Sequence, residues 1–146
     1  MQTVAHILKS KDNQAVWSIA PTAMVLEAIK LLAEKGIGAL LVMEGEQVVG
    51  IVTERDYARK VHIKGRLSDN TPVSDIMTSP VMYVRPDQTN EQCMALMTEN
   101  RLRHLPVMHE GKLIGLISIG DLVKDIISEQ QFIIQQLEHY IMGERF

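Results

Sequence analysis

The sequence lacks paired cysteines, an excess of basic residues and a long apolar run. Cys93 is the single cysteine among 146 residues, which excludes an internal disulfide and a cysteine-rich metal site. No apolar stretch approaches the roughly 18 residues of a membrane-spanning helix, and residues 1–11 have neither the basic nor the apolar region of a signal peptide. We therefore expect a cytoplasmic protein with no membrane partner.

The charge balance argues against a nucleic-acid partner. Lys and Arg number 15 against 18 Asp and Glu, a formal net charge of −3, whereas binding to phosphate backbones needs a basic surface. The five histidines show no metal-ligand spacing and have no partner cysteine or pair of carboxylates. We expect no metal site, no catalytic residue and no enzymatic activity.

What the sequence does contain is an internal repeat. A shift of 65 residues aligns Ser18–His62 with Tyr83–Ile127 without a gap. The identical pairs are Pro21/Pro86, Leu31/Leu96, Glu34/Glu99, Leu40/Leu105, Val42/Val107, Met43/Met108, Gly50/Gly115 and Asp56/Asp121. The order of helix and strand patterns is also kept, so we interpret the two halves as copies of one unit.

Each copy has the same succession of patterns. Residues 23–35 carry apolar side chains at helical spacing and stop at Gly36, and Thr89–Gln92 has the form of a capping box that opens the matching helix. Short apolar runs flanking a polar turn then predict a hairpin. The predicted hairpin strands are 39–43, 48–52, 104–108 and 113–117. A second helix follows each hairpin, so each copy is predicted as β-α-β-β-α.

These units predict an α/β fold in which two repeats pack sheet to sheet. A small sheet with helices on one face leaves the other face uncovered, and a second copy covers it. The cleft between the copies is then the candidate ligand site. The expected organisation is a first repeat at 1–63, a linker at 64–71, a second repeat at 72–128 and a C-terminal helix at 129–146.

The predicted C-terminal helix has an apolar stripe wider than one narrow face. Its apolar residues are Phe132, Ile133, Ile134, Leu137, Tyr140 and Ile141. The sequence leaves two alternatives open: the helix folds back on its own chain, or it packs on a second subunit.

A short motif follows the second hairpin strand of each copy and has the form Gly-x-x-[Thr/Ser]-x-x-Asp. Its members are Gly50, Thr53 and Asp56 in the first copy and Gly115, Ser118 and Asp121 in the second. Glycine permits close approach of a ligand, the hydroxyl and helix N-terminus can bind phosphate, and the acid can bind ribose hydroxyls. The same spacing also caps a helix. We favour the ligand site, because both copies keep the shorter Asp behind the same glycine.

The repeat resembles the CBS (cystathionine-β-synthase) domain, and the resemblance covers nearly the whole chain. It rests on Leu105-Pro106-Val107, Gly115-Leu116-Ile117-Ser118 and Asp121. It implies a tandem pair, or Bateman module, related by a pseudo-twofold axis. Such pairs are typically regulatory, non-catalytic and often dimeric, and they bind AMP, ADP, ATP, NAD or S-adenosylmethionine.

The resemblance also implies roles for individual residues. Asp56 and Asp121 would bind ribose hydroxyls, and Thr53 and Ser118 would bind phosphate. The first strand of each copy would enclose adenine. The residues concerned are Val16, Ser18, Ile19, Val81, Tyr83 and Val84.

The two copies differ in where their cations lie. The second has Arg103 and His104 before its Leu-Pro-Val strand, whereas the first has Arg55 on its helix. We predict that these residues face one cleft and that Arg103 and His104 contact phosphate. The solvated face of a helix is the expected place for the remaining cations Arg59, Lys60 and Lys124.

The sequence favours a nucleotide sensor without a catalytic cofactor. AMP, or ADP or ATP, is the first choice of ligand. NAD is second, because Arg55, Arg103 and His104 offer a place for a pyrophosphate, and S-adenosylmethionine is third. We expect a homodimer. The alternative is an interaction scaffold with vestigial clefts whose C-terminal helix binds a client protein.

Overall fold

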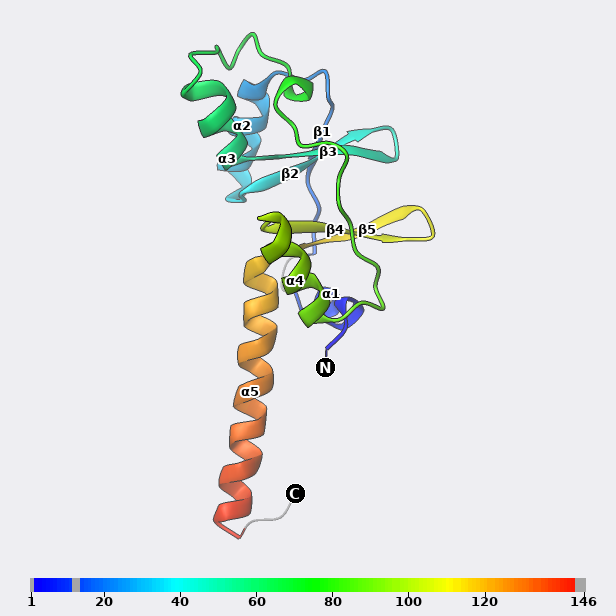
Figure 1. Cartoon of the computed structure of the whole chain (residues 1–146), viewed down its shortest axis with the longest axis vertical. Helices are drawn as coiled ribbons and strands as arrows, with labels where there is room; N and C mark the ends of the chain where they lie inside the picture. Colours follow the sequence, from blue (N-terminus) through cyan, green and yellow to red (C-terminus); the bar gives the residue numbers. More distant parts are fainter. Residues whose placement is uncertain (1, 12–13, 144–146) are drawn as a thin grey trace.

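The computed structural model describes residues 2–11 and 14–143. Two small sheets lie one above the other with helices on their outer sides, and a long helix projects from the body (Figure 1). The elements are α1 (Val4–Ser10), β1 (Ser18–Ile19), α2 (Val25–Lys35), β2 (Ala39–Glu44), β3 (Gln47–Thr53), α3 (Glu54–Tyr57), the π-helical turn η1 (Ala58–His62), the 3₁₀ turn η2 (Val73–Asp75), α4 (Asn90–Asn100), β4 (His104–His109), β5 (Lys112–Ser118) and α5 (Ile119–Ile141). The helices and hairpins predicted from the repeat are confirmed.

The two equivalent helices α2 and α4 begin in different ways. Thr89 and Gln92 form the predicted capping box of α4. Met24, at the start of α2, makes no side-chain capping bond. Instead the first amides of α2, those of Val25 and Leu26, donate to the carbonyls of Thr71 at 2.8 Å and Ser68 at 2.9 Å. The linker between the repeats therefore satisfies the donors that a capping side chain would otherwise satisfy.

The sheets differ in their first strand. In the first repeat β1 runs parallel to β2, and β2 pairs antiparallel with β3. In the second repeat β4 and β5 pair, but the expected first strand is reduced to a single bridge between Val84 and Val107. The amide of Leu41 donates to the Trp17 carbonyl at 3.2 Å. The residue equivalent to Leu41 is Pro106, which has no N–H to donate, so the second repeat loses this bond.

Three apolar clusters form the core. Each sheet packs its outer face against helices, as Leu40 and Val42 do against α2. The entry segments are exchanged between the predicted repeats: Val4 and Ile7 of α1 lie in the core of the second repeat, and Val73 and Ile76 at η2 lie in the core of the first. A third cluster lies between the sheets, where Ala39, Leu41 and Ile51 are buried against Leu113 and Leu116. The predicted sheet-to-sheet packing is confirmed. Both repeats therefore form the walls of the space between them.

The C-terminal segment is the continuation of the last helix of the second repeat. α5 runs without a break from Ile119 to Ile141, across the boundary predicted at 129. It does not fold back on the chain, since Phe132 is 59% and Tyr140 81% exposed, and Figure 1 shows it pointing away from both sheets. For the residues described, the fold-back alternative is wrong. No helix within 2–11 and 14–143 is long and apolar enough to cross a membrane.

Candidate functional site

The two Gly-x-x-[Thr/Ser]-x-x-Asp motifs form capping boxes at the starts of α3 and α5. The Asp56 amide donates to Thr53 Oγ1 at 3.2 Å, and Asp56 Oδ2 accepts from the Thr53 amide at 3.0 Å. Ser118 and Asp121 repeat the arrangement at 3.2 and 2.9 Å. The capping interpretation is therefore correct in both copies. An ionised carboxylate has about four lone-pair positions, so capping leaves acceptor capacity on each Asp.

Each of these carboxylates also binds a lysine. Lys60 Nζ lies 3.0 Å from Asp56 Oδ1 and donates to the Ile76 carbonyl at 2.8 Å. Lys11 Nζ lies 3.0 Å from Asp121 Oδ2 and donates to the Leu116 carbonyl at 2.8 Å. The prediction that Lys60 occupies a solvated helix face is wrong. Both lysines neutralise an acid while tying it to a neighbouring segment.

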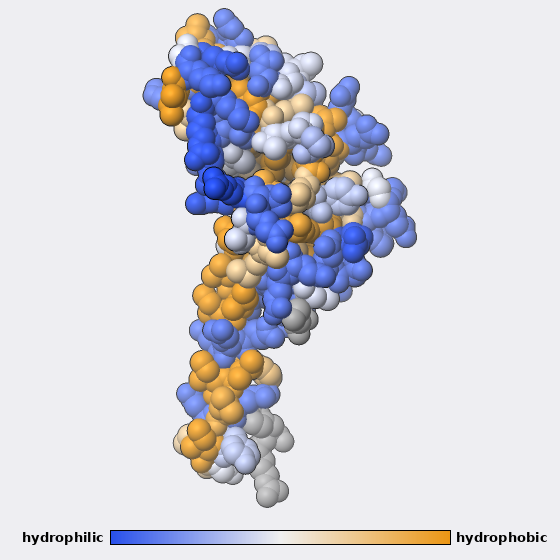
Figure 2. Space-filling view, in the orientation of Figure 1, coloured by the Kyte–Doolittle hydropathy of each residue, from blue (hydrophilic) through white to orange (hydrophobic). Residues whose placement is uncertain are grey.

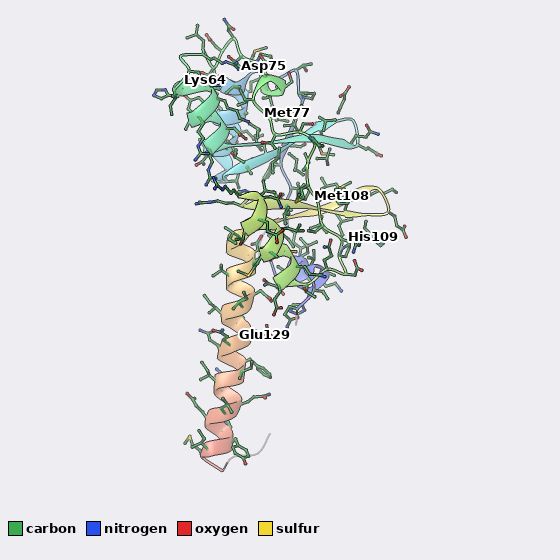
Figure 3. The ribbon with its side chains drawn as sticks, in the orientation of Figure 1. Lys64, Asp75, Met77, Met108, His109 and Glu129 are labelled. Carbon is green, nitrogen blue, oxygen red and sulfur yellow. The ribbon has the colours of Figure 1, made fainter. Side chains whose placement is uncertain are left out.

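The glycines of the motifs have a packing role. A Cβ on Gly50 would lie 2.5 Å from Met77 Sδ, and one on Gly115 would lie 2.7 Å from Leu8 Cδ2. Figure 3 shows Met77 against β3. The idea that these glycines let a ligand approach the strand is wrong, because a side chain from another segment already fills the space.

A cavity of about 310 Å³ lies between the repeats and brings together five of the predicted ligand residues. Thr53, Arg55 and Asp56 of the first copy line it together with Arg103 and His104 of the second. The prediction that cations from the two copies face one cleft is confirmed. The further lining residues are Gly38, Ile51, Glu54, Thr78, Arg101 and Leu102.

Arg101 and Thr78 line the cavity but were not predicted from the sequence. Arg101 ends α4 in the left-handed conformation, with φ of 54°. Its position two residues before Arg103 could have indicated that Arg101 also lies at the cavity. Thr78 reaches the cavity because its backbone pairs with Ile51 of β3, with bonds of 2.8 and 3.1 Å. No local sequence pattern predicts the pairing of Thr78 with Ile51.

His104 is partly buried at the cavity wall. Burial lowers the pKa of its imidazole, the nearby Asp121 carboxylate opposes this, and Lys11 and Arg103 reinforce it. The ring is therefore neutral at neutral pH, and the cavity's positive charge comes from its arginines. Arg55, Arg101 and Arg103 are exposed at its rim, where guanidinium groups can form paired hydrogen bonds with phosphate oxygens.

The other predicted ligand residues lie elsewhere. Asp121 lines a cavity of about 560 Å³ between α1 and α5, and Val81 and Tyr83 line one of about 380 Å³ beside Met108, at the hairpin end of the sheets (Figure 3). The three residues of the first repeat that were predicted to enclose adenine line none of these cavities. Val16 packs between the sheets, Ile19 packs in the core of the first repeat, and Ser18 is exposed. Ser118 caps α5. The counterpart of Thr78 in the first repeat is Asn13, which lies outside the described residues.

Among the residues described, no group of three His, Cys, Asp or Glu side chains is placed to hold a metal ion. The central cavity offers guanidinium donors, a hydroxyl and a capped carboxylate around one space. This donor set suits an anion that also carries hydroxyl groups.

Comparison with known proteins decides the family. The model of the CBS domain matches residues 6–63 and 73–128, both repeats of the chain. The chain belongs to the CBS-domain family. Proteins made of tandem CBS domains are generally regulatory and non-catalytic, and CBS domains bind adenosine ligands.

Individual relatives share this build. A protein with CBS domains from Burkholderia ambifaria is 58% identical, with a TM-score of 0.85 over 88% of this chain and 96% of that one. The mitochondrial CBS domain-containing protein CBSX3 of Arabidopsis thaliana is 39% identical over 97% of this chain and 72% of its own length. A hexameric CBS-CP12 protein from bloom-forming cyanobacteria is 33% identical, with a TM-score of 0.74 over 84% of this chain and 70% of that one.

Proposed function

We propose that this CBS pair is a non-catalytic regulatory module that binds an adenine nucleotide in the cavity between its repeats. One observation carries the proposal: Thr53, Arg55 and Asp56 of one copy share a cavity with Arg103 and His104 of the other. A ligand in this place contacts both repeats, so its binding energy depends on how they sit against each other.

The residues of the cavity divide into two roles. Arg103 and Arg55, with Arg101, bind phosphate oxygens. Asp56 accepts a ribose hydroxyl, which competes with Lys60 for Asp56 Oδ1 at 3.0 Å. Thr53 Oγ1 already donates to Asp56 Oδ2 at 3.1 Å.

The size and charge of the cavity select among adenine ligands. A volume of about 310 Å³ lies at the small end of the range of roughly 300–1,000 Å³ for ligand pockets. It suits a mononucleotide better than NAD. The arginines disfavour the sulfonium cation of S-adenosylmethionine and favour AMP, ADP or ATP.

The output of such a sensor is a shift between states that bind the nucleotide with different affinity. The hexameric CBS-CP12 protein is a precedent for self-association of a CBS chain, and we propose that this protein acts as a homodimer or on a client protein. The competing proposal is an interaction scaffold with empty cavities, because Thr53 and Asp56 also have a structural role as the capping box of α3.

Titration calorimetry separates the two. A mononucleotide of about 23 heavy atoms, at roughly 0.3 kcal/mol per atom, binds with a Kd of about 10 µM. We expect this Kd for AMP, binding of ADP and ATP as well, and weaker binding of NAD and S-adenosylmethionine.

Arg103→Gln, which removes a phosphate contact, weakens binding about 10- to 100-fold. Arg59→Gln is the matched control, since Arg59 is exposed and does not line the cavity, and it leaves the Kd unchanged. Folded wild-type protein that binds none of the five ligands would support the scaffold instead.

A further inference from the structure

α5 carries an apolar surface that its own chain leaves uncovered. Figure 2 shows hydrophobic side chains along the helix below the body. The α5 stripe consists of Val123 (42% exposed), Ile127 (49%), Ile133 (50%), Ile134 (53%), Leu137 (55%), Tyr140 (81%) and Ile141 (80%). Only the first turns of the helix join the core of the second repeat, through Ile119 and Leu122.

The spacing of the stripe is that of a helix packed on another helix. Positions 123, 127, 130, 134, 137 and 141 alternate steps of four and three residues, the repeat of a coiled-coil seam. Isoleucine occupies 127, 134 and 141, and Gln130 is the one polar member of the series. Ile133 and Tyr140 widen the stripe along one edge.

The stripe is compatible with a second copy of itself. A twofold interface brings the same surface of each subunit together, so its residues must tolerate their own counterparts. The polar residues that flank the seam are Lys124, Gln131 and Glu138, which follow seam positions 123, 130 and 137, whereas Gln135 and Gln136 lie farther round the helix. Asp125 and Glu129 fall outside the seam by helical phase. No charged residue occupies the seam itself, so two copies bury no charge when their seams pack together.

The charges of α5 disfavour an acidic membrane surface. Interfacial membrane helices carry Lys and Arg on their polar face. α5 has Lys124 and His139 as its basic residues against Asp121, Asp125, Glu129 and Glu138.

The size of the stripe suits a dimer. Val123 and Ile141 are 18 residues apart, about 27 Å along a helix. The exposed fractions of the seven residues sum to about four side chains, which at roughly 60–120 Å² for each large apolar side chain give about 250–500 Å² per copy. At the upper end, two copies reach the ~1,000 Å² total that marks a specific interface.

We propose that α5 packs against α5 of a second copy of this chain, so that the two α5 stripes bury each other in a symmetric dimer. This deepens the proposed self-association by naming its surface. It does not depend on nucleotide binding, because the stripe is separate from the cavity residues.

Sedimentation velocity from about 1 to about 200 µM, a range that spans a micromolar dissociation constant, tests the proposal. We expect the wild-type protein to shift from monomer to dimer mass. Ile134→Glu places a charge on the seam of both copies and raises the dimer dissociation constant at least about tenfold. Gln135→Glu adds the same charge on the same helix outside the seam and changes the constant by less than about threefold.

Neither substitution touches the core, and circular dichroism verifies that both variants are folded. A wild-type protein that stays monomeric throughout overturns the proposal, as does an equal dimer constant for Ile134→Glu and wild type. Arg103→Gln, which weakens nucleotide binding, leaves dimerisation unchanged, so failure of the nucleotide proposal and failure of the dimer proposal give different results.

Discussion

Asp56 and Asp121 have two tasks, because each completes a capping box and holds a lysine. We expect Asp121→Ala to lower the free energy of unfolding by about 1–2 kcal/mol, the usual worth of such a cap, and Asp56→Ala to do the same. Urea unfolding followed by circular dichroism measures it. Asp69→Ala, at an exposed linker position, is the control and stays within about 0.5 kcal/mol. An equal loss for all three would contradict the capping role.

His104 makes stability depend on pH. Its pKa is lowered by burial in the folded state, so as pH falls through about 6.5 the unfolded chain takes up a proton that the folded chain resists. Stability at this site is therefore complete above the unfolded pKa and decreases below it. Unfolding of wild type and His104→Gln at pH 7.5 and pH 5.5, on either side of about 6.5, should show the smaller loss in the variant. The same pH dependence in both proteins would show that His104 is not responsible.

At the scale of elements, the close packing of Met77 on Gly50 joins β3 to the segment that enters the second repeat. We expect Gly50→Ala to cost about 1–3 kcal/mol of stability, because the new methyl overpacks the contact. In a Met77→Ala background the same change should cost less, since the clashing side chain is gone. A double-mutant cycle by urea unfolding measures the difference, and equal costs in both backgrounds would rule out the clash.

The helices and hairpins were predictable because their signals are local. Gly36 ends α2 in the left-handed conformation with φ of 64°, and Thr89 and Gln92 cap α4, all within a few residues of the element concerned. The loss of the second repeat's first strand was predictable in principle from Pro106, once the register of β4 was known. The sequence alone does not show which backbone hydrogen bond is lost because Pro106 has no N–H.

The site was predictable only in part, for a different physical reason. The clustering of Thr53, Arg55 and Asp56 follows from one helix turn, and the repeat symmetry brought Arg103 and His104 to the same place. The contact of Lys11 with Asp121 joins residues far apart in the sequence, and no periodicity encodes it. The filling of the space above Gly50 by Met77 likewise depends on how two segments meet.

At the scale of the whole molecule, the proposed nucleotide site lies between the two repeats. Each repeat supplies part of one cavity, and the buried contact of Leu41 with Leu113 and Leu116 keeps the two parts together. α5 lies outside this arrangement and extends from the second repeat (Figure 1). A ligand should therefore perturb residues of both repeats around the cavity and leave the projecting part of α5 unaffected.

The most direct test is an amide chemical-shift titration of ¹⁵N-labelled protein with AMP, repeated with ATP. We expect saturable shifts at residues 53–56 and 101–104, with residues 133–141 unchanged. An absence of shifts with either nucleotide, or shifts confined to residues away from both segments, would contradict it.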